Sequence, residues 1–328
     1  MTLRIGILGA ARVATYAMIA AARDVDGVEV VAVAARDPER AKTYAAAHGI
    51  PKTYANYQSL IEAEDVDAVY NALPPNLHAK WSIAAVDADK PVLCEKPFAL
   101  GVADVEAMLA AEMRTGRLIM EAQHTYHHPR HARIREIVQT GLLGKVRHIS
   151  AQFDVPVPKT PEEIRWDGAV GGGALWDLGV YPAFWLRAIM GEEPQAVSAA
   201  HLLNEKGADI WTDAAFTFAS GGTGSISCSM ERVFAAWLKV EGDGGTLFVD
   251  NFLSPPKQQT LTFDIDGQIT EERFTGRPTY PFQLEAFRDA VLRGESVHTR
   301  GADSLATIQL LQDIHALAEK GLAHAHRR

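Results

Sequence analysis

Residues 91–97 read Pro-Val-Leu-Cys-Glu-Lys-Pro, a short apolar run that ends in a pair of opposite charges and a proline. The apolar residues 92–94 are typical of a buried parallel strand, and Pro97 prevents the hydrogen-bond ladder of that strand from continuing. Open parallel sheets bind their ligands in the crevice at the carboxyl ends of the strands. We therefore expect Glu95 and Lys96 at such a crevice. The alternative is a solvent-exposed ion pair at the start of a loop.

Apolar strands and helical segments alternate on both sides of this run, through about the first 122 residues. Strand, tight turn and helix at this spacing predict a Rossmann-type, doubly wound parallel sheet, and so an α/β fold. Right-handed crossovers would turn the carboxyl ends of all the strands toward one crevice. The expected strands are residues 3–8, 28–34, 53–54, 68–73, 91–94 and 118–122.

The turn after the first expected strand reads Gly9-Ala10-Ala11-Arg12-Val13-Ala14. Between a strand and a helix, a glycine-rich turn indicates dinucleotide binding. Gly9 supplies the tight turn, but Ala11 and Ala14 stand at the second and third glycine positions of that fingerprint. Alanine at the second position leaves less room for a pyrophosphate. The turn alone therefore leaves an ordinary strand–helix connection as an equal alternative.

The second expected strand is followed by Ala35-Arg36-Asp37-Pro38. An NAD-specific domain has an acidic residue at the end of this strand, which holds the adenosine ribose. A small residue followed by arginine suits a 2′-phosphate instead, because a guanidinium group binds phosphate with two hydrogen bonds. We therefore predict NADP as the cofactor, with NAD also possible. In the alternatives, Arg36 is only an exposed residue before a helix, and Asp37 caps that helix or holds the ribose.

Three glycines, Gly171-Gly172-Gly173, precede an apolar helix that carries Asp177 and Tyr181 on one face. We expect these glycines to let the backbone approach a ligand and to leave N–H groups free at the start of the helix. The alternative is a flexible linker. A buried aspartate needs a partner, and Tyr181 and Lys96 are the candidates for Asp177.

After Pro194 the pattern changes to alternating strands separated by Gly, Asn and Asp turns, which predicts a large, mainly antiparallel sheet. We expect an α+β second domain over residues 123–328, which binds the substrate and forms oligomers, after a nucleotide-binding domain over residues 1–122. One face of its sheet should pack on helices. The other face, with Phe216, Phe218, Ile226 and Trp237, is predicted to form a homodimer or homotetramer.

The composition of the 328 residues excludes several classes of protein. The formal net charge of −9 and the absence of a long basic stretch argue against nucleic-acid binding. No apolar run approaches the roughly 20 residues of a membrane span, and no signal pattern is evident, so we expect a cytoplasmic protein. The only two cysteines, Cys94 and Cys228, fit a reducing compartment.

Four histidines, His124, His127, His128 and His131, lie close together in the sequence. His127 and His131 have a spacing that can bind a metal on a helix. Pro129 lies between them, and no cysteine or second carboxylate is near, so we expect no metal site. A position on the wall of a substrate cleft is the better expectation for one or two of these histidines.

Several motifs occur in a characteristic order: the Gly-Ala turn, Pro74-Pro75-Asn76-Leu77-His78, Glu95-Lys96-Pro97, and residues 171–181, which read Gly-Gly-Gly-Ala-Leu-Trp-Asp-Leu-Gly-Val-Tyr. Over essentially its whole length, the chain resembles the glucose–fructose oxidoreductase/inositol dehydrogenase (Gfo/Idh/MocA) family. It is most similar to the branch of NADP-dependent D-xylose dehydrogenases and dimeric dihydrodiol dehydrogenase. The resemblance implies that Asn76 and His78 line the nicotinamide-ribose side and that Glu95 orients this region.

Hydride transfer from an alcohol needs a nicotinamide, a group that takes the hydroxyl proton, and a charge that stabilises the alkoxide. Lys96 supplies a cation, Tyr181 a phenol, and Asp177 holds one or both; the resemblance implies the same roles. The expected cofactor residues are Gly9, Ala11, Arg12, Val13, Ala35, Arg36, Leu73, Pro74, Asn76, His78, Glu95 and Lys96. The expected substrate residues are Lys96, His124, Trp166, Asp177 and Tyr181.

The sequence therefore predicts an NADP-dependent oxidoreductase that acts on a hydroxyl or carbonyl carbon of a sugar or related cyclic polyol. A reductase of a keto-sugar, or of a non-sugar carbonyl or diol, is the alternative among enzymes. A nucleotide-sensing protein without turnover is the alternative outside them, but a sensor does not need a proton-transfer pair. The identity of the substrate does not follow from the sequence.

Overall fold

The computed structural model describes residues 2–253, 259–274 and 276–325. Its contacts divide the chain into two compact units. The first unit comprises Met1–His127 and Thr279–Leu305, and the second comprises His128–Pro278 and Ala306–Arg328.

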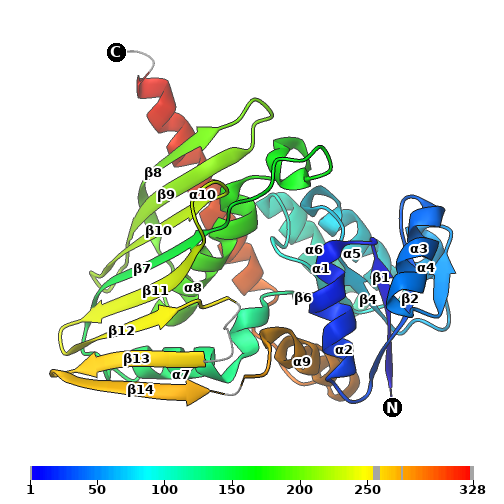
Figure 1. Cartoon of the computed structure of the whole chain (residues 1–328), viewed down its shortest axis with the longest axis horizontal. Coiled ribbons are helices and arrows are strands. Elements are labelled where there is room, and N and C mark those ends of the chain that lie inside the picture. Colours follow the sequence, from blue (N-terminus) through cyan, green and yellow to red (C-terminus); the bar gives the residue numbers. More distant parts are fainter. Residues whose placement is uncertain (1, 254–258, 275, 326–328) are drawn as a thin grey trace. The chain divides into compact units, whose positions relative to one another are not determined.

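The first unit contains a six-stranded sheet in which every neighbouring pair of strands is parallel (Figure 1). The strand order is β3-β2-β1-β4-β5-β6. It reverses between β1 and β4, the switch point at which doubly wound sheets bind ligands. The predicted Rossmann-type sheet is therefore confirmed. Its strands are β1 Leu3–Leu8, β2 Val28–Ala34, β3 Lys52–Tyr54, β4 Ala68–Asn71, β5 Val92–Cys94 and β6 Ile119–Glu121.

Local sequence signals set the helix ends in this unit. The Asp37 side chain accepts a hydrogen bond from the Glu39 N–H and caps α3, and Gly49 ends this helix with φ 71°. Residues 12–23 form a continuous helix whose middle is π-helical. The helices are α1 Arg12–Ala14, η1 Thr15–Ala20, α2 Ala21–Arg23, α3 Pro38–His48, α4 Tyr57–Ile61, η2 Pro75–Leu77, α5 His78–Asp87, α6 Val102–Thr115, η3 His124–His127 and α9 Thr279–Arg293.

Helix α9 lies far along the sequence but belongs to the first unit. Its Leu284 and Phe287 are fully buried in the same apolar core as Ile5 and Ile7 of β1. The compact units thus differ from the predicted division at residue 122, because an amphipathic pattern does not show which core a helix will join.

The second unit contains an eight-stranded sheet in the order β14-β13-β12-β11-β7-β10-β9-β8 (Figure 1). Neighbouring strands are antiparallel except for the parallel pair β7 and β10, so the predicted mainly antiparallel sheet is confirmed. The strands are β7 Val146–Asp154, β8 Gln195–Leu203, β9 Asp209–Thr217, β10 Thr223–Ser229, β11 Ala235–Gly242, β12 Gly245–Asp250, β13 Gln259–Ile265 and β14 Gln268–Phe274.

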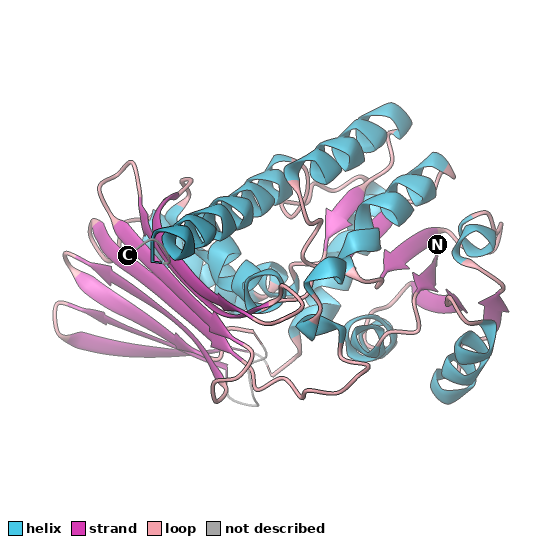
Figure 2. Ribbon diagram, turned by 90° about the horizontal axis from the view of Figure 1, so that it is seen from above, coloured by secondary structure: helices cyan, strands magenta, loops and turns pink. Residues whose placement is uncertain are grey.

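Helices cover one face of this sheet (Figure 2). They include α7 Pro129–Gln139, η6 Leu175–Gly179 and α8 Val180–Met190. The other helices are η4 Ile164–Trp166 and η5 Gly168–Val170, in the loop before the three glycines, and α10 Ala302–Ala325, whose first residues belong to the first unit. Among all helices of the described segments, none is both long enough and apolar enough to cross a bilayer.

The expectation that Phe216, Phe218 and Ile226 lie on the open face of the sheet is wrong. All three side chains are at most 5 % exposed. A Cβ atom at Gly224, which pairs with Phe216, would touch Leu186 of α8, so this side of β10 is the helix-covered side. The strand pattern alternates correctly, but it does not show which of its two faces receives the helices.

The open face instead carries small and polar side chains, which line a shallow hollow of about 530 Å³. Trp237 is the large member of this set and is partly exposed. The others on this side include Ser150, Asp213, Ala215, Ser225 and Ser227.

Helix α7 begins with a histidine that must stay neutral. The His128 Nδ1 atom accepts a hydrogen bond from the Arg130 N–H at 3.1 Å, and the side chain is buried. Burial lowers the pKa of His128 from 6.5 to about 4, and the Arg130 charge acts in the same direction. A protonated Nδ1 would also lose its capacity to accept this bond.

We expect His128 to make the stability of the second unit dependent on pH. Because its folded pKa is lowered, the unfolded chain takes up the proton first, and stability present above pH 6.5 is lost as the pH falls toward 4. The loss should be on the order of 1 kcal/mol per pH unit. His128→Asn keeps a capping oxygen and cannot titrate. Thermal unfolding from pH 7.5 to 4 should show a flatter acid dependence for this variant, and parallel curves would contradict the assignment.

Candidate functional site

Lys96 is presented by a stretch of buried chain at the carboxyl end of β5. Between Pro91 and Ala99, every residue is buried except Lys96, which is partly exposed. The Lys96–Pro97 peptide bond is cis. This part of the first unit therefore presents one cationic side chain just after the carboxyl end of β5, the end at which sheets of this kind bind ligands.

Glu95, immediately before it, is a buried carboxylate with two partners. The Tyr70 hydroxyl donates to one carboxylate oxygen at 2.5 Å, and the Lys96 N–H donates to the other at 3.2 Å. Glu95 is 6 % exposed and Tyr70 is fully buried. Burial raises the pKa of Tyr70 well above its ordinary value, and the charge of Glu95 adds to this rise. The phenol therefore remains a donor to the carboxylate.

His78 connects two loops of the crevice. Its Nδ1 atom lies 2.8 Å from the Pro97 carbonyl oxygen, and its Nε2 atom lies 2.8 Å from the Leu73 carbonyl oxygen. The ring is 1 % exposed, and burial lowers its pKa. A neutral ring can donate to only one of these carbonyls. His78 thus lies between the loop after β4 and the loop after β5, and a direct contact with the cofactor stays a prediction.

Other residues predicted near the nicotinamide have different degrees of exposure. Asn76 is exposed and Pro74 is partly exposed, whereas Leu73 is buried. The Asn71 side chain binds the His78 carbonyl oxygen and the Ser82 hydroxyl, so it supports this loop from within.

The turn after β1 fits a dinucleotide in two respects. Gly9 has φ 97°, and a Cβ atom there would lie 3.2 Å from the Ala72 carbonyl oxygen, so the close approach of β1 and β4 requires glycine. The helix that follows starts after Ala11 without a side-chain cap, in contrast to the Asp37 cap of α3. An uncapped helix start beside a glycine turn suits an anionic pyrophosphate.

Two arginines, rather than the single predicted one, lie near the Tyr57 phenol: Arg36 follows β2, and Arg40 lies in the first turn of α3. Arg36 and Arg40 are both exposed, and both charges act on the Tyr57 phenol and lower its pKa against the larger effect of burial. Arg40 also donates to the Ala10 carbonyl oxygen at 3.0 Å, which places it beside the glycine turn. Arg40 is not among the predicted cofactor residues, although its position four residues after Arg36, in the first turn of α3, was a usable signal.

His124 lies in the first unit, next to the start of α9. Its Nδ1 atom is 2.6 Å from the Thr279 hydroxyl, and its ring stacks on Tyr280 at 4.1 Å. Burial lowers the pKa of His124 to about 3, and the positive charge of Lys96 contributes to this shift. The His124 imidazole, which is only 3 % exposed, is therefore neutral near Lys96.

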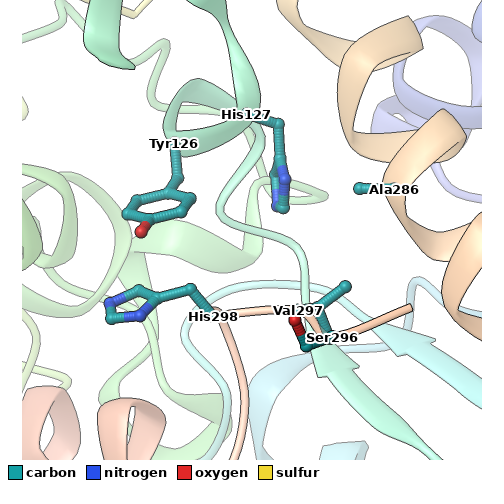
Figure 3. A pocket seen from close by; sticks show the side chains of 6 residues that line it. All are labelled: Tyr126, His127, Ala286, Ser296, Val297 and His298. Carbon is teal, nitrogen blue, oxygen red and sulfur yellow. The ribbon is translucent and has the colours of Figure 1, made fainter. Parts of the chain in front are cut away.

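A separate cavity of about 410 Å³ opens in the first unit between η3 and the segment after α9 (Figure 3). The rings of Tyr126 and His298 stack along one side at 4.6 Å. None of the residues predicted for the cofactor or the substrate lines it. Its lining residues are Tyr126, His127, Ala286, Ser296, Val297 and His298.

In the second unit, Asp177 has a partner that the sequence analysis did not name. The Arg165 guanidinium lies 3.6 Å from an Asp177 carboxylate oxygen and also binds both oxygens of Glu163. Asp177 lies in the π-helical segment η6, and π-helical turns are frequent at functional sites. The loop before the glycines thus supplies a charge network around Asp177.

The three glycines make hydrogen bonds within the unit, so the expectation that they leave N–H groups free is wrong. The N–H groups of Gly172 and Gly173 donate to the carbonyl oxygens of Asp167 and Arg165 at 2.9 Å each. A Cβ atom at Gly173, where φ is 126°, would collide with the Asp209 carboxylate. That carboxylate accepts from the Leu175 N–H at 2.8 Å and so fixes the start of the helix.

The other predicted residues of the second unit pack against neighbouring side chains or backbone groups. Tyr181 is 7 % exposed, with its ring edge against Phe153. The Trp166 indole N–H donates to the Pro158 carbonyl oxygen. His131 stacks on Trp185 in the core of the second unit. In the described part of the chain, no group of three or more His, Cys, Asp or Glu residues is placed to hold a metal ion.

Two family profiles match the chain. The profile described as "Oxidoreductase family, NAD-binding Rossmann fold" covers residues 3–124. The profile described as "GFO/IDH/MocA C-terminal domain" covers residues 131–248. Together they cover the whole first sheet and strands β7 to β11 of the second sheet.

Similar proteins extend over nearly the whole chain. A dTDP-3,4-didehydro-2,6-dideoxy-alpha-D-glucose 3-reductase of Saccharopolyspora spinosa is 35% identical and covers 90% of this chain and 89% of its own. A D-xylose 1-dehydrogenase (NADP(+)) of Haloferax volcanii is 30% identical, with coverages of 97% and 98%. A crystal structure of a 3-ketoreductase from Actinomadura kijaniata, in complex with NADP and TDP-benzene, is 30% identical, has a TM-score of 0.90 and gives coverages of 97% and 98%.

The Rossmann sheet, the crevice with Lys96 and these matches agree with one another. The first unit is an NAD(P)-binding domain, and the chain is an oxidoreductase that belongs to the Gfo/Idh/MocA family.

Proposed function

We propose that this protein is an NADP-dependent oxidoreductase acting on a hydroxyl or carbonyl carbon of a sugar or related cyclic polyol. The observation that carries the proposal is Lys96, a partly exposed cation in an otherwise buried segment at the carboxyl end of β5. A cation carried by buried, ordered backbone stabilises an oxyanion better than a lysine on a mobile surface loop would, because less of its surroundings must reorganise.

The proposal assigns the chemistry to residues of both units. When bound, the cofactor accepts or supplies the hydride of the reaction. Lys96 stabilises negative charge on the substrate oxygen, and the Tyr181 hydroxyl exchanges the proton with that oxygen. Asp177, with Arg165, orients Tyr181 and the substrate. His124 and Trp166 are proposed to contribute to the walls of the substrate site.

The proposed cofactor residues follow the crevice of the first unit. The glycine turn with Gly9, Ala11, Arg12 and Val13 would receive the pyrophosphate. Leu73, Pro74, Asn76, His78 and Glu95 would form the nicotinamide side, where His78 and Glu95 support the loops. Ala35 and Arg36 would face the adenosine ribose. We add Arg40, because a second guanidinium beside Arg36 suits the double charge of a 2′-phosphate.

A keto-sugar reductase is the second candidate, and the name of the Saccharopolyspora spinosa relative favours it. The same residues serve both directions, since hydride transfer and proton exchange are reversible. A screen should follow NADP⁺ reduction with aldoses, inositols and aryl diols, and NADPH oxidation with keto-sugars. Binding of NADPH without turnover on any of these would instead favour a nucleotide-sensing protein.

We predict that Arg36→Ala weakens NADP binding by about 1–3 kcal/mol while NAD binding changes little, because a charge-assisted phosphate contact is lost. Arg40→Ala should act in the same direction. Fluorescence titration with both cofactors measures this difference. Arg114→Ala, which changes an exposed residue of α6, is the control. Equal losses for NADP and NAD would contradict the role of Arg36.

Tyr181→Phe removes one hydroxyl and should lower kcat by roughly 10²–10⁴, the usual contribution of a general acid–base group. NADPH affinity should remain near that of the parent. Lys96→Met keeps the length of the side chain and removes its charge, so its loss of kcat should be at least as large. Lys80→Met, an exposed residue of α5, is the control. Near-parental kcat for Tyr181→Phe on the best substrate of the screen would refute the mechanism.

We further propose a cytoplasmic homodimer or homotetramer that assembles through the open face of the second unit's sheet. Ser225→Arg places a long charged side chain among the small side chains of this face, where it would prevent close packing of a second copy, and should dissociate the assembly. Glu205→Arg, in the exposed turn between β8 and β9, is the control. Light scattering of the parent at micromolar concentration measures the mass, and a value near 35.7 kDa would contradict assembly.

A further inference from the structure

The segment that carries Lys96 is held by a side chain from the neighbouring strand. Tyr70 lies on β4 and pairs with Leu93 of β5, one step before the strands end. The Glu95 N–H donates to the Asn71 carbonyl oxygen at 3.0 Å, so the ladder continues as far as Glu95. The next residue is Lys96. Glu95 is thus the last residue of the segment fixed by the sheet.

The Glu95 carboxylate joins the fixed strand to the lysine. One oxygen accepts the Tyr70 hydroxyl at 2.5 Å, and the other accepts the Lys96 backbone N–H at 3.2 Å. A rotation of this carboxylate would break one of the two bonds. The Tyr70 hydroxyl is therefore coupled to the backbone at Lys96 through this carboxylate.

We propose that Tyr70 is a positioning residue for the reaction, which aims the Lys96 side chain by holding the Glu95 carboxylate. The inference rests on the proposed function, in which Lys96 stabilises the substrate oxyanion. Tyr70 itself is fully buried and touches neither substrate nor cofactor in this assignment.

The free-energy cost of burying the Glu95 carboxylate beside the Tyr70 phenol supports the inference. A buried carboxylate loses its hydration, and an apolar pair of similar volume often gives equal or greater stability. Polar pairs of this kind concentrate at functional sites. The pair stands one residue from Lys96, at the crevice end of the sheet.

The same sheet contains a matched pair outside the crevice. The Tyr54 hydroxyl on β3 donates to Asp65 at 2.5 Å, again a phenol bound to a carboxylate. Asp65 also pairs with Lys52, and this group lies at the edge strand of the sheet. Tyr54→Phe therefore controls for the loss of a phenol–carboxylate bond as such.

Several titratable groups surround Glu95. Tyr280 of α9 and Tyr16 of η1 interact electrostatically with Tyr70, and Tyr280 also with Glu95. Lys96 follows in the chain, and Glu121 of β6 acts with Glu95 on the Cys94 thiol. Tyr70→Phe removes one hydrogen-bond donor from the ionised Glu95 carboxylate. Loss of a donor to the ionised form raises the pKa of a carboxyl group.

The test compares Tyr70→Phe with Tyr54→Phe and the parent. For Tyr70→Phe we expect kcat to fall roughly 10- to 100-fold, the effect of a misplaced reacting group, with little change in NADPH affinity. The acid limb of the kcat/KM profile should move up by about one to two pH units, the equivalent of one charge-assisted hydrogen bond. In the cofactor-free protein, amide hydrogen exchange in residues 93–99 should become faster. Tyr54→Phe should change none of these.

Two results would overturn the inference. The first is a kcat within twofold of the parent with an unmoved acid limb. The second is a loss of kcat without a shift of the limb, accompanied by a lower unfolding temperature, since that is the mark of a structural role alone. Should Tyr70→Phe not fold, Glu95→Gln removes the charge and keeps an acceptor, and it should lower kcat and abolish the acid limb.

Lys96→Met separates this inference from the proposed function. Retained turnover in Lys96→Met would refute the proposed function, whatever Tyr70→Phe does. Lost turnover in Lys96→Met, together with Tyr70→Phe behaving like Tyr54→Phe, would refute only the role of Tyr70. The exchange rates of residues 93–99 give an answer that does not depend on activity.

Discussion

The buried carboxylate of Glu95 is the constraint on which the crevice of the first unit depends. A carboxylate that is 6 % exposed needs hydrogen-bond donors from its surroundings, and the Tyr70 hydroxyl and the Lys96 N–H provide them. On the other side of Lys96, the Pro97 carbonyl oxygen lies 2.8 Å from the Nδ1 atom of the buried His78. Lys96 is therefore the partly exposed member of a segment whose other groups are committed to internal bonds.

A second buried carboxylate has a comparable role in the second unit. Asp209 is 2 % exposed and accepts from the Leu175 N–H and the Thr212 hydroxyl. It thereby fixes the start of the helix that carries Asp177 and Tyr181. Gly173 is required because any side chain there would displace this carboxylate. In both units, a satisfied internal carboxylate positions a residue to which we assign a role in the reaction.

Local sequence patterns predicted the strands well, and the reasons for the failures are specific. The alternation around Phe216 and Ile226 was correct, yet the side of the sheet that the helices cover depends on distant segments such as α8. The glycine run looked like a ligand-binding turn, but its N–H groups bind carbonyl oxygens of the preceding loop. Arg165 was missed because it approaches Asp177 only through the folding of that loop.

The sequence by itself determined the alternation of strands and helices, the glycine at the first turn, the family, and the presence of Lys96, Asp177 and Tyr181 in characteristic motifs. These are local properties, set by residue type and spacing over a few turns or strands. Only the tertiary structure decided that α9 joins the core of the first unit, that Tyr70 holds Glu95, and that Arg40 joins Arg36 near Tyr57. The reason is physical: a buried polar group is satisfied by whichever partner the packing of distant segments brings within hydrogen-bond reach, and that distance is not written in any short stretch of sequence.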